Sequence, residues 1–191
     1  MSPLADREKQ QLLELARRAL IAGVEKRQSV REFPDAPPLQ QPGGAFVTLY
    51  RHGRLRGCVG QLPSKDPLVE VVAHCAKAAA LEDPRFKPVP AEELAEIEIE
   101  LSILSPLADV TLEKIEAGQH GLVVSHGWRR GVLLPQVATQ FSWQAERFLE
   151  ETCIKAGLER EAWKDPHTRI QAFTAEVFAE IALQPRVNPL R

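Results

Sequence analysis

Two short segments of this chain have similar sequences, and each segment predicts a tight β-hairpin. They are His52-Gly53-Arg54-Leu55-Arg56-Gly57-Cys58-Val59 and His126-Gly127-Trp128-Arg129-Arg130-Gly131-Val132-Leu133. In each segment a His-Gly pair separates two runs rich in strand-forming residues, and the glycine supplies the positive φ that two-residue hairpin turns require. A helical pattern follows each hairpin. We therefore expect two hairpin-plus-helix units related by an internal duplication, with a chance similarity of two glycine-bearing turns as the alternative.

Hydrophobic spacing predicts the helices that accompany these hairpins. Apolar residues recur at helical intervals over residues 12–20, 68–79 and 148–153. Ser142 is the expected N-cap of the third helix, and Gly157 is expected to end it. The alternation of hairpins and helices indicates an α+β class of fold.

Two strands and one irregular segment complete the predicted organisation. Apolar and polar residues alternate over residues 97–103, which predicts a strand with one buried and one solvated face. Val177, Ala179 and Ile181 indicate a last strand. Residues 24–44 are rich in proline and glycine, so we predict an irregular segment that is long enough to cover a site.

Composition narrows the class of protein. The chain has 191 residues, enough for one well-buried domain, 1–191, or for two small lobes that share a sheet. Its 24 basic and 26 acidic side chains give a formal net charge of -2, which disfavours nucleic-acid binding because no overall field attracts a phosphate backbone. The N-terminus lacks a signal-like pattern, and no apolar run reaches the roughly 18 residues of a membrane helix. Three widely spaced cysteines form no disulfide pattern, so we expect a reduced, cytoplasmic protein.

Cys58 is the first candidate for a functional side chain. It lies between Gly57 and Gly60, and glycines in a strand allow a ligand or another backbone to approach closely. Arg56 would favour the nucleophilic thiolate form of Cys58, provided that no bulge puts the two side chains on different faces. We therefore take Cys58 as a candidate catalytic residue and Arg56, Gly57 and Gly60 as candidate ligand contacts. The alternative is a small hydrophobic side chain in a sheet, because no base is identifiable beside it.

Four further residues are candidate ligand contacts. Arg85 follows Pro84 and precedes two more prolines, which suits a guanidinium aimed at a small anionic ligand, although a helix-terminating turn is the alternative. His120 stands at the start of a strand, where it is either a base or ligand contact or a polar turn residue. Arg130 corresponds to Arg56 in the second hairpin segment, and Gln136 either binds a ligand or caps a turn.

Other chemistry has less support in the sequence. Cys58, Cys75 and a histidine such as His74 do not have the spacing of a known metal site, so no metal is predicted. Glu98 and Glu100 share one strand face, where we favour a solvated pair that binds Arg or Lys across the sheet over acid–base catalysis. The GxGxxG, P-loop, GxSxG and HExxH patterns are absent, and we predict no cofactor.

Several segments in order resemble the AMMECR domain family, also called AmmeMemoRadiSam system protein A. The segments are Leu55-Arg56-Gly57-Cys58-Val59-Gly60, Glu82 to Phe86, Glu98 to Pro106, His120-Gly121-Leu122, Arg130 to Ala138, and Phe148 to Trp163. The similarity extends from about Leu12 to Ile181, and in the first segment Val59 replaces the family's isoleucine. It implies an α+β fold of two β-rich repeats that form one mostly antiparallel, barrel-like sheet with flanking helices. It also implies a bacterial or archaeal setting beside a Memo-like dioxygenase-fold protein and a radical SAM protein.

The resemblance implies no established reaction, so the sequence supports an enzymatic and a non-enzymatic role alike. Our first hypothesis is a ligand-binding or accessory enzymatic component of a modification system with those two partners. Cys58, Arg56 and Arg85 would then line a cleft between the repeat units, with His120 nearby. The second hypothesis is a non-catalytic module that docks the same partners. A nucleic-acid-binding protein is the third and weakest, because no basic stripe is present.

Overall fold

The computed structural model describes residues 3–26 and 30–180. The chain forms two compact units, which are treated separately below. Unit 1 comprises Met1–Leu104 and Glu176–Arg191, and unit 2 comprises Ser105–Ala175. Strand β7 (Arg169–Ala179) begins in unit 2 and ends in unit 1. Hydrogen bonds link the strands in the order β2-β1-β3-β7-β5-β6, with β4 on β7. The predicted α+β class is confirmed.

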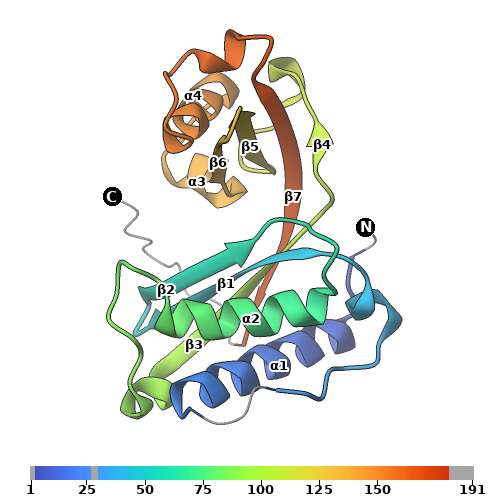
Figure 1. Ribbon diagram of the computed structural model, residues 1–191, viewed down its shortest axis with the longest axis vertical. Coiled ribbons are helices and arrows are strands. Elements are labelled where there is room, and N and C mark those ends of the chain that lie inside the picture. The colour runs from blue at the N-terminus through green and yellow to red at the C-terminus, as the bar shows by residue number, and fades with distance from the viewer. Residues whose placement is uncertain (1–2, 27–29, 181–191) are drawn as a thin grey trace. The chain divides into compact units, whose positions relative to one another are not determined.

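Unit 1 is a sheet covered on one face by two helices. Strands β1 (Gly44–Arg51), β2 (Arg54–Gln61) and β3 (Ile97–Leu104) pair in antiparallel fashion, with β1 in the middle. Helices α1 (Asp6–Val24) and α2 (Leu68–Leu81) lie side by side along this sheet (Figure 1). Their apolar stripes and every second residue of β1 and β3 form the core. Its fully buried members include Leu12, Leu15, Val72, Val47, Leu49, Ile99 and Leu101.

The prediction that one face of β3 is exposed to solvent is wrong. Glu100 and Ser102 lie on the face away from the helices, yet they are only 8% and 2% exposed. β3 is an interior strand with β1 on one side and β7 on the other, so side chains of both neighbouring strands flank Glu100 and Ser102 on that face. The alternation of apolar and polar residues therefore marks a buried polar row and not a wet surface.

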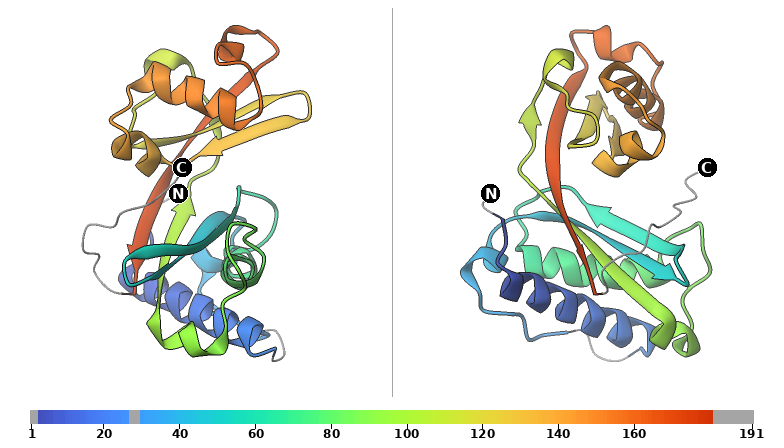
Figure 2. Two further views of the ribbon diagram at one scale, coloured as in Figure 1. Left: turned by 90° about the vertical axis from the view of Figure 1, so that its left-hand side faces the viewer. Right: turned by 180° about the vertical axis from the view of Figure 1, so that it is seen from behind.

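Unit 2 is built on the second hairpin. Strand β5 (His120–His126) pairs with β6 (Arg129–Leu133) and with the first part of β7, and the short β4 (Ala108–Asp109) pairs with β7. All of these pairs are antiparallel. Helix α3 (Pro135–Gln140) follows the hairpin, and α4 (Ala145–Lys155) packs on β5 and β6 (Figure 2).

The two hairpins have different turns despite their similar sequences. In the first, Arg51 pairs with Arg54, and the loop residues His52 and Gly53 have φ values of 51° and 72°, as in a type I′ turn. In the second, His126 pairs with Arg129, so the loop is Gly127-Trp128 and not the predicted His126-Gly127. His126 is the last residue of β5. The two segments therefore share their residues but not their strand register.

A glycine at the matching position of each hairpin segment, Gly57 or Gly131, lets a helix pack closely against the strand. A Cβ atom on Gly57 would collide with the carbonyl oxygen of Ala79 in α2. A Cβ atom on Gly131 would collide with the backbone around Ala156, at the end of α4. Each glycine thus lets a helix approach its hairpin at backbone distance, although α2 is the next helix after the first hairpin whereas α4 comes after α3 in the second.

The predicted ends of the third helix are half right. Gly157 has a φ of 73° and ends α4 as predicted. Ser142 does not cap α4, whose N-cap is Gln144. Ser142 instead has a φ of 53° and follows α3, where its N–H donates to Thr139 O at 3.2 Å. It is the left-handed residue that ends one helix, two positions before the N-cap of the next.

The remaining sequence predictions are close to what is observed. Residues 30–36 have no regular structure and are followed by a 3-10 turn, Pro37–Gln40, while residues 27–29 lie outside the described part of the chain. The last strand contains Val177 and Ala179 as predicted but begins as early as Arg169, and Ile181 is not among the described residues. Within the described residues, no helix is long and apolar enough to cross a membrane.

Candidate functional site

Cys58 belongs to a polar row that crosses three strands of unit 1. Thr48 on β1 lies opposite Cys58 on β2, and Glu100 on β3 lies opposite Thr48. The row faces away from α1 and α2, because the flanking residues of these strands fill the helix-covered core. The Thr48 hydroxyl donates to Cys58 Sγ at 3.4 Å. The thiol is partly exposed, whereas Thr48 and Glu100 are buried.

The loop after α2 holds the backbone of Cys58 through Asp83. The Asp83 carboxylate is 5% exposed and accepts the Cys58 N–H at 2.8 Å. The same carboxylate accepts the Arg85 backbone N–H at 3.1 Å, Nε at 3.0 Å and Nη2 at 2.7 Å. Arg85 Nη2 also reaches the Cys58 carbonyl oxygen at 3.4 Å. We call Cys58, Thr48, Glu100, Asp83 and Arg85 the Cys58 site.

These contacts decide the charge of the site. Burial by itself raises the pKa of Asp83, but the hydrogen bonds from Arg85 and from the Cys58 N–H outweigh burial and lower that pKa to about 2. Burial also raises the pKa of the Cys58 thiol, and the hydrogen bond from Thr48 and the charge of Arg85 only partly oppose it. The carboxylates of Asp83 and Glu100 add to the increase. At neutral pH Asp83 is therefore a carboxylate beside the Arg85 guanidinium, and Cys58 is a neutral thiol.

Arg56 is not the guanidinium beside Cys58. The pairing of β1 with β2 shifts after Leu49, which lies opposite Gly57, while Tyr50 lies opposite Leu55. Arg56 is the extra residue of this bulge, and its side chain turns to Glu93 at 2.8 Å and to the Lys87 carbonyl oxygen at 2.9 Å. The bulge that would separate Arg56 from Cys58 is therefore present. Arg85 takes the position beside the thiol that the sequence suggested for Arg56.

Gly57 and Gly60 make room for other parts of the protein. Gly57 admits the backbone of α2, as described above. Gly60 lies opposite Phe46, and the Phe46 ring covers the place where a Cβ atom would be. In unit 2 the Phe173 ring covers Gly121 in the same way. Both candidate glycines thus have a packing role in unit 1.

The other three predicted contacts lie in unit 2. His120 Nδ1 accepts the Glu116 N–H at 3.1 Å and so stabilises the turn before β5. Arg130 on β6 and Gln136 on α3 are exposed. Of the predicted site residues, Cys58 and Arg85 are joined by direct contacts, and Asp83 and Thr48 were missed. Asp83-Pro84-Arg85 does have a recognisable signal, since an Asp that accepts the N–H two residues later is a common turn device.

The other two cysteines are buried and take no part in the Cys58 site. Cys75 is fully buried, and burial raises its pKa to about 12, with the Cys58 thiol adding to the increase. Cys153 is also fully buried. Among residues 3–26 and 30–180, no three His, Cys, Asp or Glu side chains are grouped so that they could hold a metal ion.

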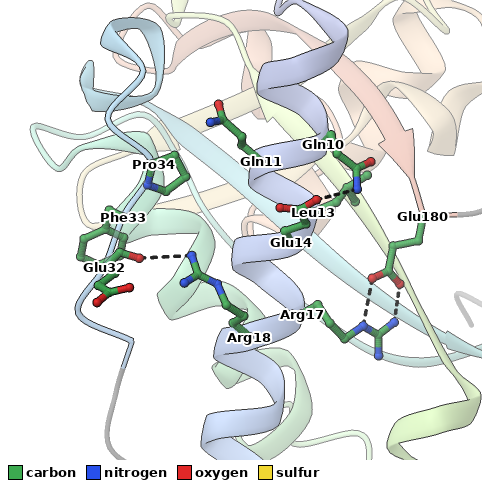
Figure 3. A pocket seen from close by; sticks show the side chains of 10 residues that line it. All are labelled: Gln10, Gln11, Leu13, Glu14, Arg17, Arg18, Glu32, Phe33, Pro34 and Glu180. Atoms are coloured by element: carbon green, nitrogen blue, oxygen red, sulfur yellow. Dashed lines mark hydrogen bonds and ion pairs between the residues drawn. The ribbon is translucent and has the colours of Figure 1, made fainter.

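Apart from the Cys58 site, a surface pocket lies on the outer side of α1, and none of the predicted site residues line it (Figure 3). Its volume is about 840 Å³. Arg17 forms an ion pair with Glu180 there, and Arg18 donates to the Glu32 carbonyl oxygen at 3.2 Å. Gln10 donates to Glu14 at 3.0 Å. The lining combines charges of both signs with the apolar side chains of Leu13, Phe33 and Pro34, so it favours no single class of ligand.

The fold and site describe an α+β protein with a neutral thiol in a fixed polar row, outside the common catalytic patterns. The AMMECR1 family model matches residues 13–178, and the chain belongs to that family. A protein from Methanothermobacter thermautotrophicus is 41% identical over 187 residues, which cover 94% of this chain and 97% of the relative. Protein TK0174 from Thermococcus kodakarensis is 42% identical, with 88% of each chain covered. The crystal structure of the uncharacterized protein PH0010 from Pyrococcus horikoshii matches with a TM-score of 0.83, 38% identity and 93% of each chain covered.

Proposed function

We propose that this AMMECR1-family protein is a ligand-binding accessory component of a modification system, and that the Cys58 site recognises a small anionic ligand. The observation that carries the proposal is the Arg85 side chain. Asp83 and the Cys58 carbonyl oxygen anchor it, yet 43% of its surface is exposed. An anchored and partly exposed guanidinium loses little freedom on binding, which favours recognition of a carboxylate or phosphate group.

The state of the thiol favours binding over covalent catalysis. A nucleophilic cysteine works as the thiolate, but the environment of Cys58 raises its pKa. The Thr48 hydroxyl donates a hydrogen bond to Sγ, so Thr48 does not act as a base toward the thiol. In this proposal Cys58 is a polar contact in the wall of the site. Chemistry would belong to the Memo-like and radical SAM partners, in the cytoplasm, where all three cysteines stay reduced.

Binding of inorganic phosphate tests the site directly. Calorimetry should detect phosphate binding to the wild-type protein and lose it in Arg85→Ala. Arg54→Ala is the matched control, because Arg54 is an exposed arginine at the start of the same strand that carries Cys58. Equal phosphate binding by Arg85→Ala and the wild type would exclude Arg85 as the anion contact.

Docking of the two partners without a ligand is the second candidate function. The neutral thiol also favours it, since a docking module needs no nucleophile. Cys58→Ala protein should then still co-purify with a co-expressed Memo-like or radical SAM partner, and it should still support their activity. Loss of partner activity with co-purification retained would instead favour the ligand-binding role.

The internal duplication also belongs to this proposal. Gly57 and Gly131 each admit the backbone of a helix later in the same unit, α2 and α4, and this similar packing supports a common origin of the two segments. The different registers of the two hairpins are then later changes. In a duplicated barrel-like sheet, the Cys58 site would be the part unique to the first repeat, because Val132 stands where the first segment has Cys58.

A further inference from the structure

The tip of the second hairpin presents a tryptophan to solvent. Trp128 is the second loop residue of the β5–β6 turn, and it is 89% exposed, the highest value among the large hydrophobic residues described as exposed. The Arg129 guanidinium lies 5.6 Å from the ring centre. Tryptophan is strongly enriched among the residues that dominate the energy of protein interfaces. An indole held at a hairpin tip is therefore suited to insertion into another surface.

A cavity of about 380 Å³ lies beside this tryptophan. One wall is the end of the hairpin itself, and the other wall comes from the segment that follows α4. The lining residues are His126, Gly127, Trp128, Arg129, Leu158, Glu159 and Ala162. Leu158 and Ala162 supply apolar surface, while Glu159 and Arg129 supply charges of opposite sign. The cavity is large enough for an aromatic side chain.

Hydrogen bonds fix the walls of the cavity. The Leu158 N–H donates to Cys153 O at 3.0 Å, and the Gly157 N–H donates to Ile154 O at 2.9 Å. This pair of hydrogen bonds is the Schellman motif at a helix C-terminus. Arg129 Nη1 donates to Gly157 O at 2.7 Å and joins the hairpin to this helix end.

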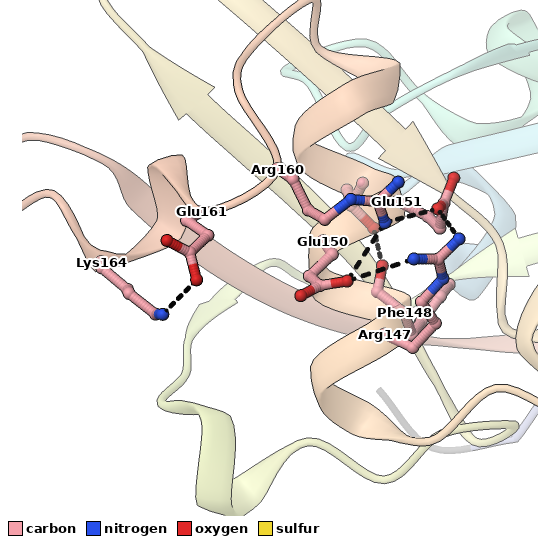
Figure 4. A network of polar contacts seen from close by, with 8 residues as sticks. Arg147, Phe148, Glu150, Glu151, Arg160, Glu161 and Lys164 are labelled. Carbon is pink, nitrogen blue, oxygen red and sulfur yellow. Dashed lines mark hydrogen bonds and ion pairs between the residues drawn. The ribbon is translucent and has the colours of Figure 1, made fainter.

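The segment after the helix end is also tied down. Arg160 binds Glu150 at 3.1 Å and Glu151 at 3.0 Å, which fastens it to α4 (Figure 4). On the hairpin side, His126 Nδ1 lies 3.0 Å from Thr168 Oγ1. Both walls of the cavity are therefore organised before anything binds, which reduces the entropy lost on association.

We infer that this surface pairs two copies of the chain, with Trp128 of each copy in the cavity of the other. The projecting indole and the cavity are neighbours in one patch, which is the arrangement that a twofold interface requires. The charges agree with this pairing. Arg129 and Glu159 both line the cavity, so each patch carries one positive and one negative group, and a twofold arrangement can set the arginine of one copy against the carboxylate of the other. The occupant of the cavity is a second copy of this chain.

The size of the patch sets the strength of the pairing. A buried tryptophan contributes about 150–250 Å². Two indoles with the surfaces that cover them give less than the roughly 1,200 Å² at which stable protein interfaces begin. We therefore expect a reversible dimer with a dissociation constant on the order of micromolar or weaker. Such a dimer depends on protein concentration.

Sedimentation equilibrium over a wide range of protein concentration tests this inference. The wild-type mass should rise toward that of a dimer, and Trp128→Ala should remain a monomer over the same range. Because Trp128 is 89% exposed, its removal should leave the fold intact. Phe141→Ala is the control, since Phe141 is also an exposed aromatic residue of unit 2, at 42%, but does not line the cavity. It should associate like the wild type.

A mixing experiment distinguishes specific pairing from nonspecific association. Ala162→Arg fills the cavity and keeps Trp128, so it should be a monomer alone. Mixed with Trp128→Ala, it should associate again, because Ala162→Arg keeps the indole while Trp128→Ala keeps the cavity wall formed by Leu158, Glu159 and Ala162. The mixed dimer should be weaker than the wild-type dimer, since it keeps one of two contacts. Glu159→Lys offers a second cavity variant at an exposed position and should weaken pairing several-fold.

The inference is overturned by any of three results. The wild type stays a monomer at every concentration, Trp128→Ala associates as strongly as the wild type, or the two variants fail to complement although both are folded by circular dichroism. The first result would exclude a second copy of the chain as the occupant of the cavity. None of these results bears on phosphate binding at Arg85, so the proposed function is tested separately.

Discussion

The Asp83 carboxylate accepts the backbone N–H of Cys58 at 2.8 Å, across 25 residues of sequence. Asp83 also binds Arg85, which reaches back to the Cys58 carbonyl oxygen. Both peptide groups of Cys58 are thus held from one loop, and the loop depends on one buried carboxylate.

Asp83→Asn should destabilise the protein more than an ordinary surface change. The amide keeps the size of the side chain but loses the charge that Arg85 and two backbone N–H groups bind. Hydrogen bonds to a charged group contribute about 1.5–3 kcal/mol each, and they are not additive, so we expect a loss of about 2–3 kcal/mol. Urea denaturation measures it. Asp35→Asn, at an exposed position, is the control and should change stability by less than about 0.5 kcal/mol.

The contribution of Asp83 should depend on pH in a defined window. Its folded-state pKa is about 2 and its ordinary value is 3.8, so the unfolded state takes up the proton first as the pH falls. The stabilisation is therefore fully present above about pH 4 and is lost as the pH falls toward 2. A shift of this size corresponds to at most about 2 kcal/mol, and less where solvent screens the exposed side of Arg85. The stability difference between the wild type and Asp83→Asn should shrink over this window, and a constant difference would contradict the assignment.

Local chemistry in the sequence was enough to predict the first hairpin, the end of α4 at Gly157 and the strand around Ile99. Each depends on residues within a few positions of one another. Ser142 shows the limit of such patterns. A serine before a helix suits an N-cap, but the preceding helix α3 ends two residues earlier and uses Ser142 as its left-handed terminal residue. Ser142 lies between the end of α3 and the start of α4. It is too close to α3 to cap α4, whose N-cap is Gln144.

The site was less predictable because its contacts join distant segments. The bulge at Arg56 depends on how β1 and β2 pair, and it moves Arg56 from Cys58 to Glu93. Arg85 replaces it because the Asp-Pro-Arg turn points the guanidinium back along its own loop. The polar row of Glu100 was mistaken for a wet face, since alternation of residue types does not show which strands are interior.

Gly57→Ala should be poorly tolerated. Its new methyl group would overlap the carbonyl oxygen of Ala79, and neither the strand nor the helix backbone can yield easily. Overpacking of this kind costs about 1–3 kcal/mol or more, and thermal unfolding should show a clearly lowered midpoint. Gly53→Ala is the comparison. Nothing lies near its Cβ position, so only the positive φ of 72° opposes it and the cost should be about 1 kcal/mol. Equal effects would mean that α2 does not pack against β2 at Gly57.

The reactivity of Cys58 offers a test of its electrostatic surroundings. Cys58 is partly exposed while Cys75 and Cys153 are buried, so iodoacetamide should modify Cys58 first in the folded protein. The rate should nevertheless be lower than that of a free thiol at neutral pH, because burial raises the pKa of Cys58.

Thr48→Val removes the hydrogen bond that lowers this pKa, and Arg85→Ala removes the favourable charge, so both should move the pH profile of alkylation upward. Arg54→Ala should leave the profile unchanged. A thiol that reacts rapidly near neutral pH, or a profile that moves downward in Thr48→Val, would show that Cys58 is a thiolate in the folded protein and would return it to the catalytic role.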